Sequence, residues 1–162
     1  MGIALLWGVA GLSRVPISGA GDDEALLRLS WRTIGVRVEE CRRRTEEELA
    51  ALAEHMRTPE VCTGREADYA LSVVVDGDSV VQDTLIPAGA RRDRPIYVFQ
   101  DVPLAPGRYH VAVGFDALLP EGYDPEGRPV SFSWEGDIGL TSGRIALVTL
   151  DEAGRTLALR AP

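Results

Sequence analysis

The sequence predicts a mainly β fold: an antiparallel β-sandwich with one inserted short α-helix and an apolar N-terminal segment. Eight or nine short stretches alternate apolar and polar residues, with a spacing of roughly ten residues that is typical of a sandwich. Gly, Pro and Asp-Gly turn signals separate these stretches, and only residues 46–57 follow a helical period instead. The same strands could also close into a barrel, which is the alternative architecture.

The chain of 162 residues has the length of one domain. We find no internal repeat and no linker, so we expect an N-terminal segment over 1–20 and one sandwich domain over 21–162. The composition excludes a disordered chain, because 45% of residues are hydrophobic and 26% are charged.

The first predicted strand is Ala25–Trp31, where Leu27, Leu29 and Trp31 share one face. Residues 36–40 alternate again before Cys41, and Asp76-Gly77 is a hairpin turn signal. A long loop is expected over 118–129. The remaining strands are expected at 69–75, 79–86, 95–102, 108–115, 130–134, 144–150 and 156–159.

A helix over 46–57 is predicted from its N-terminal signal and its apolar spacing. Thr45 and Glu48 have the spacing of a capping box, and acidic residues follow the cap, where the helix dipole favours them. The apolar positions recur at helical spacing, so we expect this stripe to face a core. The stripe consists of Leu49, Leu52, Ala53 and Met56.

The two cysteines, Cys41 and Cys62, flank this helix. In an exported protein an even pair predicts a disulfide, here one that would hold both ends of the helical segment. Two buried free thiols are the alternative. A zinc site is disfavoured, because neither cysteine has a Cys or His two to four residues away.

The stretch from Val102 to Val113 reads VPLAPGRYHVAV. It resembles the L-x-P-G-x-Y-x-V-x-V hairpin of immunoglobulin-like and transthyretin-like sandwiches. The resemblance implies an immunoglobulin-like sandwich in which a Pro-Gly turn leads into a core strand and Tyr109 packs at the end of the sandwich. It implies no particular function.

Charge and motifs argue against several classes of function. The net charge of −8 disfavours nucleic-acid binding, and no apolar run reaches the roughly 18–20 residues of a spanning helix. The only histidines, His55 and His110, lie outside metal-binding patterns, and neither a G-x-S-x-G nor a phosphate-binding glycine motif occurs. We therefore expect no catalytic residue, no cofactor and no metal. A weak calcium site on the acidic loop 116–129 stays open as an alternative.

Residues 3–12 are apolar and uncharged, and they are too short to span a bilayer. They fit either a signal-peptide hydrophobic region or a short anchor that contacts lipid or a membrane-embedded partner. The residues expected to make this contact are Ile3, Leu5, Leu6, Trp7, Val9 and Leu12.

Two further groups of residues are expected to bind a protein partner. The first is basic and could dock onto an acidic protein patch or onto anionic lipid headgroups; for its first three members, which precede three glutamates, local Arg–Glu pairing is the alternative. It comprises Arg42, Arg43, Arg44, Arg91, Arg92 and Arg94. The second comprises Leu118, Leu119 and Tyr123. These three interrupt a polar loop, and the alternative is that they fold back and cap the end of the sandwich.

The function expected from these features is that of a non-catalytic accessory subunit on the periplasmic side of a bacterial membrane, holding or bridging protein subunits of a membrane complex. Arg replaces Lys throughout and Asn is absent, which indicates a GC-rich bacterial genome. The whole profile resembles the membrane-extrinsic polypeptides that brace a photosynthetic reaction centre within its light-harvesting ring. The alternative is a periplasmic module that binds carbohydrate or peptide.

Overall fold

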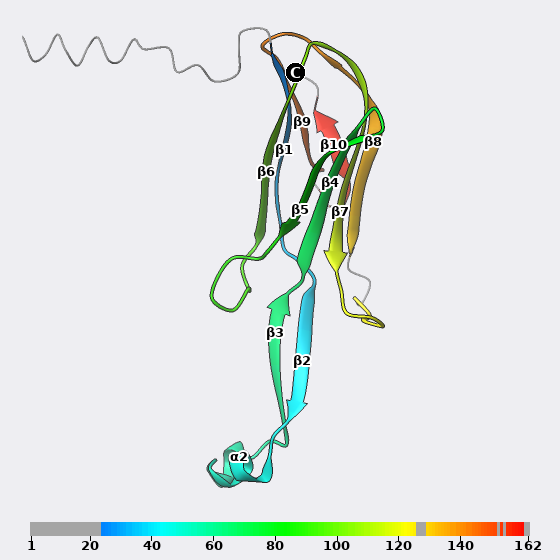
Figure 1. The fold of residues 1–162 in the computed structure, drawn as a ribbon. Coiled ribbons are helices and arrows are strands. Elements are labelled where there is room, and N and C mark those ends of the chain that lie inside the picture. The colour runs from blue at the N-terminus through cyan, green and yellow to red at the C-terminus, as the bar shows by residue number, and fades with distance from the viewer. Residues whose placement is uncertain (1–23, 126–128, 152, 154, 161–162) are drawn as a thin grey trace, which may run out of the picture.

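The computed structural model describes residues 24–125, 129–151, 153 and 155–160 (Figure 1). Within these residues two four-stranded sheets pack against each other, and a two-stranded ribbon projects from one end. The predicted mainly β sandwich with a short inserted helix is therefore confirmed. The apolar segment 3–12 lies outside the described residues.

The first sheet has the strand order β10-β9-β1-β6. Its strands are β1 (Ala25–Thr33), β6 (Ile96–Leu104), β9 (Ile145–Leu150) and β10 (Leu157–Arg160). β1 pairs antiparallel with β6 but parallel with β9, so the sandwich is not antiparallel throughout. β1 and β9 begin at the same end of this sheet. Two backbone hydrogen bonds join the chain there: Gly143 N–H donates to Glu24 O at 2.9 Å, and Leu26 N–H donates to Arg144 O at 3.0 Å.

The second sheet has the order β5-β4-β7-β8 and is antiparallel throughout. Its strands are β4 (Asp68–Val75), β5 (Asp78–Leu85), β7 (Gly107–Leu118) and β8 (Ser131–Leu140). The Asp76-Gly77 turn joins β4 to β5 with φ values of 51° and 92°. Two consecutive left-handed residues match the twist of a hairpin, and an Asp-Gly pair favours them.

The core lies between the sheets, where alternate residues of both sheets meet. Leu27, Leu29 and Trp31 are buried, as their spacing predicts. Phe115 lies at the centre of the aromatic packing: it stacks on Tyr69 with ring centroids 4.5 Å apart and makes a T-shaped contact with Trp31 at a centroid distance of 5.6 Å. Buried aromatic rings of this size contribute much of the apolar area that stabilises a small sandwich.

The Pro-Gly stretch before Tyr109 does not form a hairpin within one sheet. It carries the chain from β6 in the first sheet to β7 in the second. The Tyr109 hydroxyl donates to Ala105 O at 2.9 Å, which is the tyrosine-corner contact described for such crossings. Tyr109 therefore does pack at the end of the sandwich, as the resemblance implies.

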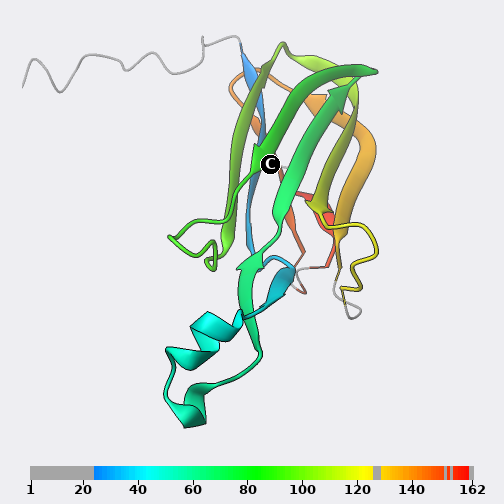
Figure 2. The same cartoon turned by 60° about the horizontal axis from the view of Figure 1, so that its bottom comes forward.

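The ribbon consists of β2 (Arg37–Arg43) and β3 (Glu60–Glu66). Figures 1 and 2 show it extending away from both sheets, with α2 (Glu46–Ala50) and η1 (Glu54–Met56) at its tip. β3 was not expected from the sequence, because its apolar alternation is weak and its one buried residue is Glu66.

The predicted helix over 46–57 is wrong in its length and in its packing. The α-helix ends at Ala50, and Ala53 adopts an extended conformation with ψ of 148° before the single turn η1. Neither helix contains a buried residue, and Met56 is 53% exposed. The apolar stripe does not face a core because the tip of the ribbon lies away from the two sheets (Figure 2).

Candidate partner-binding site

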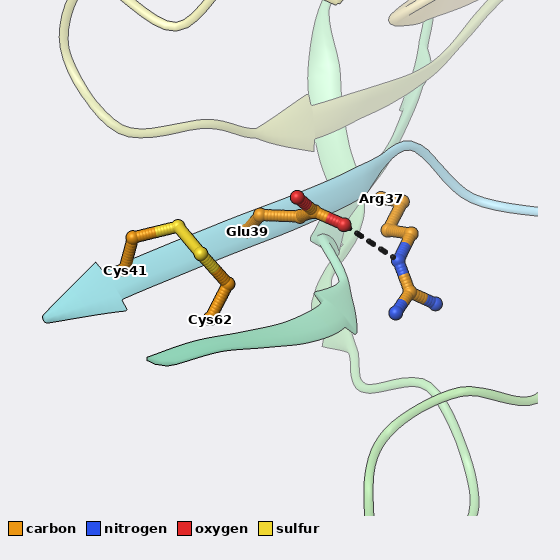
Figure 3. Close-up of a disulfide and its surroundings, with 4 residues drawn as sticks. All are labelled: Arg37, Glu39, Cys41 and Cys62. Carbon is orange, nitrogen blue, oxygen red and sulfur yellow. Dashed lines mark hydrogen bonds and ion pairs between the residues drawn. A yellow bond between two sulfur atoms is a disulfide. The ribbon is translucent and has the colours of Figure 1, made fainter. Parts of the chain in front are cut away.

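The ribbon is a seven-pair antiparallel ladder in which Cys41 lies directly opposite Cys62. The two cysteines form the predicted disulfide, so neither is a free thiol. Figure 3 shows the bond crossing between the two strands, with the nearby ion pair in which Arg37 Nε lies 3.4 Å from Glu39 Oε1. A hairpin alone is marginally stable in water, so the disulfide holds together a segment that has little core of its own.

The first turn of α2 is fixed by the predicted capping box. Thr45 Oγ1 accepts from Glu48 N–H at 3.2 Å, and Glu48 Oε2 accepts from Thr45 N–H at 2.9 Å. Arg42 also donates two hydrogen bonds to the Glu48 carboxylate, at 2.8 and 2.9 Å. The bonds from Arg42 are the largest cause that lowers the pKa of Glu48, to about 2, and the bond from Thr45 adds to it. The carboxylate therefore stays charged across the physiological range.

The three consecutive arginines of the ribbon have different surroundings. Arg42 is paired with Glu48, which agrees with the alternative of local pairing. Within the described part of the chain, no carboxylate lies within ion-pair distance of Arg43 or Arg44. Both arginines line a shallow hollow with Pro59 and Glu60, and Arg43 lies opposite Glu60 in the ladder. The apolar side chains of Leu49, Leu52 and Met56 belong to the same end of the ribbon and are half-buried or exposed.

The base of the ribbon is bound to the end of the sandwich by backbone hydrogen bonds. Ala67 N–H donates to Val36 O at 2.8 Å, and Val36 N–H donates to the Tyr69 hydroxyl at 3.1 Å. Burial raises the pKa of the Tyr69 hydroxyl, so it stays neutral. Glu66 N–H donates to Arg92 O at 2.8 Å. These contacts fix the direction in which the ribbon leaves the sandwich.

The loop between β5 and β6 brings its arginines to this base. Arg92 Nη1 lies 3.3 Å from Asp68 Oδ2, and Arg91 Nε lies 3.2 Å from Asp93 Oδ2. Arg94 is exposed. Arg92 therefore supports the ribbon, and the arginines of this loop lie at the other end of the ribbon from Arg43 and Arg44.

The loop 116–129 also meets the base of the ribbon. Leu119 and Tyr123 are partly buried against the core, and the Tyr123 hydroxyl donates to Arg37 O. Leu118 is the last residue of β7 and is 49% exposed. The structure places Leu119 and Tyr123 as a cap on the sandwich end, which was the alternative role for this loop.

One polar cluster was not anticipated from the sequence. On the outer face of the second sheet, His110 Nδ1 lies 2.9 Å from Asp137 Oδ1 and His110 Nε2 lies 3.0 Å from Glu135 Oε1. The bond with Asp137, followed by the bond with Glu135, raises the pKa of His110. The cluster was missed because the strand expected at 130–134 runs on to Leu140. Among the described residues, no group of His, Cys, Asp or Glu has the arrangement to hold a metal ion.

The candidate site is thus the ribbon, with its tip as the accessible part and its base as the support. In the portion of the chain that the structure describes, no helix has the length and apolar character to cross a bilayer. The sequence matches no family model, and neither the curated proteins nor the solved structures contain a match.

Proposed function

We propose that this protein is a non-catalytic accessory subunit that acts outside the cytoplasm and binds a protein of a membrane complex through the tip of its ribbon. The observation that carries the proposal is the ribbon itself. Its disulfide, its capping box and the paired Arg42 all fix the shape of a segment that contributes little to the core. A fixed shape lowers the entropy lost when a partner binds.

The chemistry of the tip is suited to a protein partner. Met56 is exposed and adaptable, and such side chains are common at binding surfaces. Arg43 and Arg44 supply cations at the same end of the ribbon, and Arg is enriched at the centres of protein interfaces. We propose a partner that offers an apolar patch bordered by carboxylates.

The proposed location rests on the disulfide, since such bonds persist in the periplasm and outside the cell and are rare in the cytosol. Membrane association, with residues 3–12 as the anchor, remains part of the proposal. The profile of the sequence resembles the membrane-extrinsic polypeptides of a photosynthetic reaction centre with its light-harvesting ring. We therefore propose this assembly as the first complex to test.

We further propose that the sandwich is of the immunoglobulin type. The order β5-β4-β7-β8 corresponds to strands C′-C-F-G of that fold, and the pair β1-β6 corresponds to B-E. The Tyr109–Ala105 contact supports the same assignment, because a tyrosine corner belongs at the E–F crossing. The ribbon would then be an insertion between strands B and C.

A photo-crosslinking amino acid at position 56 tests the binding role in native membranes. We expect a specific adduct with a membrane-complex subunit, because Met56 is at the exposed tip. The matched control places the same amino acid at Val80, which is 43% exposed on the sandwich. Identical adducts at both positions would contradict a role specific to the tip.

A trimmed variant gives the second test. Val38 lies opposite Arg65 in the ladder, so residues 39–64 can be replaced by the dipeptide Asn-Gly, which closes a two-residue hairpin. We expect this variant to fold and to lose association with the complex. Full co-purification of the trimmed variant would overturn the proposal.

A further inference from the structure

The outer face of the first sheet carries an unusual set of side chains for an acidic protein. Leu27, Leu29 and Trp31 point into the core, so the alternate residues of β1 point outward. On the neighbouring edge strand β6, the outward side chains include two large aromatic rings that are 65% and 67% exposed. We name this surface the basic-aromatic face and define it by Arg28, Arg32, Tyr97, Phe99, Leu147 and Arg160.

The two rings are held in place by arginines of the adjacent strand. The Arg28 guanidinium lies 5.0 Å from the centroid of Phe99, and the Arg32 guanidinium lies 5.7 Å from that of Tyr97. Arg28 is itself fixed by two hydrogen bonds of 2.7 Å to the Asp101 carboxylate. The rings are thus ordered on the surface, although more than half of each is in contact with solvent.

The face is positively charged, whereas the whole chain has a net charge of −8. Asp101 neutralises Arg28. Among the described residues, no carboxylate lies within ion-pair distance of Arg32 or Arg160. The opposite outer face, on the second sheet, carries the exposed carboxylates Glu135 and Asp137. The two faces of the sandwich therefore differ in the sign of their charge.

The strand registers show that the face extends across the whole sheet. Arg28 lies opposite Asp101 on one side and opposite Leu147 on the other, and Leu147 lies opposite Arg160. This row therefore reads cation, aliphatic side chain, cation and carboxylate over four strands, and the two aromatic rings lie beside it on β6. Tyr and Arg side chains with an apolar body and a polar end are typical of the boundary between hydrocarbon and headgroups.

We propose that the basic-aromatic face binds an anionic lipid surface, with Arg32 and Arg160 on the headgroups and the rings of Tyr97 and Phe99 at headgroup depth. Charge complementarity selects this occupant. A second copy presenting the same face would bring like charges together, whereas anionic headgroups attract these cations. In this orientation the strands lie along the membrane, so the ribbon would reach sideways towards a neighbouring membrane protein.

The first test measures partition of the full chain onto phosphatidylcholine vesicles with and without phosphatidylglycerol, at low salt. In the double variant Arg32→Gln/Arg160→Gln we expect binding to the anionic vesicles to fall about fivefold for each arginine removed. The control Arg57→Gln/Arg108→Gln removes the same charge from two exposed arginines outside the face. Both variants keep residues 1–23, so the difference between them reports on the face. An equal loss in both would overturn the proposal.

The second test detects contact between the face and the bilayer directly. In the variant Phe99→Trp, we expect brominated phosphatidylcholine in the anionic vesicles to quench the added indole fluorescence. In Val80→Trp, on the other side of the sandwich, we expect no added quenching. Unquenched fluorescence at position 99 would overturn the proposal. A second outcome would also overturn it: if the Arg32→Gln/Arg160→Gln variant binds vesicles normally but loses association with the complex, the face binds an acidic protein partner instead.

This proposal does not depend on the role of the ribbon. The trimmed variant that lacks residues 39–64 keeps the whole basic-aromatic face, so we expect its vesicle binding to equal that of the full chain. Failure of tip crosslinking and failure of lipid binding are therefore separate outcomes.

Discussion

His110 is held between carboxylates of the neighbouring strand, and this position should make stability depend on pH. Its folded pKa is raised above the unfolded value, with the bond to Asp137 as the largest cause. The folded state therefore binds the proton more tightly. The stabilisation is fully present below the unfolded pKa of about 6.5 and is lost as the pH rises through the folded pKa.

We expect the chemical shifts of His110 to titrate at a higher pH than an unperturbed histidine, and the variant Asp137→Asn to lower that pKa. An NMR titration of both proteins measures the change. Replacement of Asp83, an exposed carboxylate on β5 far from His110 in the sheet order, is the control. An unchanged titration in Asp137→Asn would show that the hydrogen bond has no effect in solution.

Tyr109 is a second residue whose hydroxyl has one defined role. The variant Tyr109→Phe removes the hydrogen bond to Ala105 O, so we expect the free energy of unfolding to fall by about 1 kcal/mol. Tyr97→Phe is the matched control, because that ring is 65% exposed on an outer face. Chemical denaturation of both variants measures the difference, and equal stabilities would contradict a structural role for the corner.

At the scale of elements, the disulfide should act on the ribbon rather than on the sandwich. The loop closed by Cys41 and Cys62 lies wholly within the ribbon, with a sequence separation of 21. We expect Cys41→Ser/Cys62→Ser to lower the local stability of the ribbon by about 3 kcal/mol. The sandwich transition should change little, since the ribbon side chains are mostly exposed.

Hydrogen exchange resolves the two effects. We expect faster exchange over residues 38–65 in the double serine variant and unchanged exchange in β4 and β7. Alkylation of the unreduced wild-type protein should find no reactive thiol. A matching increase of exchange in β7 would show instead that ribbon and sandwich unfold together.

The elements that the sequence predicts well are those with one buried face. Leu27, Leu29 and Trp31 alternate with polar residues, so the strand and its inner face follow directly. β3 has no such pattern, because it pairs only with β2 in a solvent-exposed ribbon. The stripe from Leu49 to Met56 has helical spacing, but its environment depends on where the ribbon points, which no local pattern specifies.

In the candidate site too, local features could be predicted from the sequence, and contacts between distant segments could not. The pairing of Cys41 with Cys62 and the capping box of Thr45 and Glu48 are local features, and both could be predicted. The contact of His110 with Glu135 and Asp137 depends on the register of β7 with β8. The contact of Tyr123 with Arg37 depends on a loop folding back across the molecule. Spacing in the sequence carries no information on either.

At the scale of the whole molecule, the sandwich should fold without the ribbon. The core is formed by the two sheets, and the ribbon adds Val38 near its base. We therefore expect the variant that lacks residues 39–64 to melt within about 4 °C of the full chain, equivalent to about 1 kcal/mol for a domain of this size. Calorimetry measures the shift. A broad transition or none at all would show that the ribbon is needed for folding.

The parallel pairing of β1 with β9 has a consequence for the order in which the chain can fold. β4 with β5 and β7 with β8 are neighbours in sequence and pair through local connections, whereas Arg28 pairs with Asp101 and Leu26 with Ile145. Distant pairings form slowly, because a long loop must close before they stabilise anything. During synthesis the second sheet can assemble first. One edge of β1 then stays unpaired until β9 has been synthesised, because β9 is the strand that pairs with that edge.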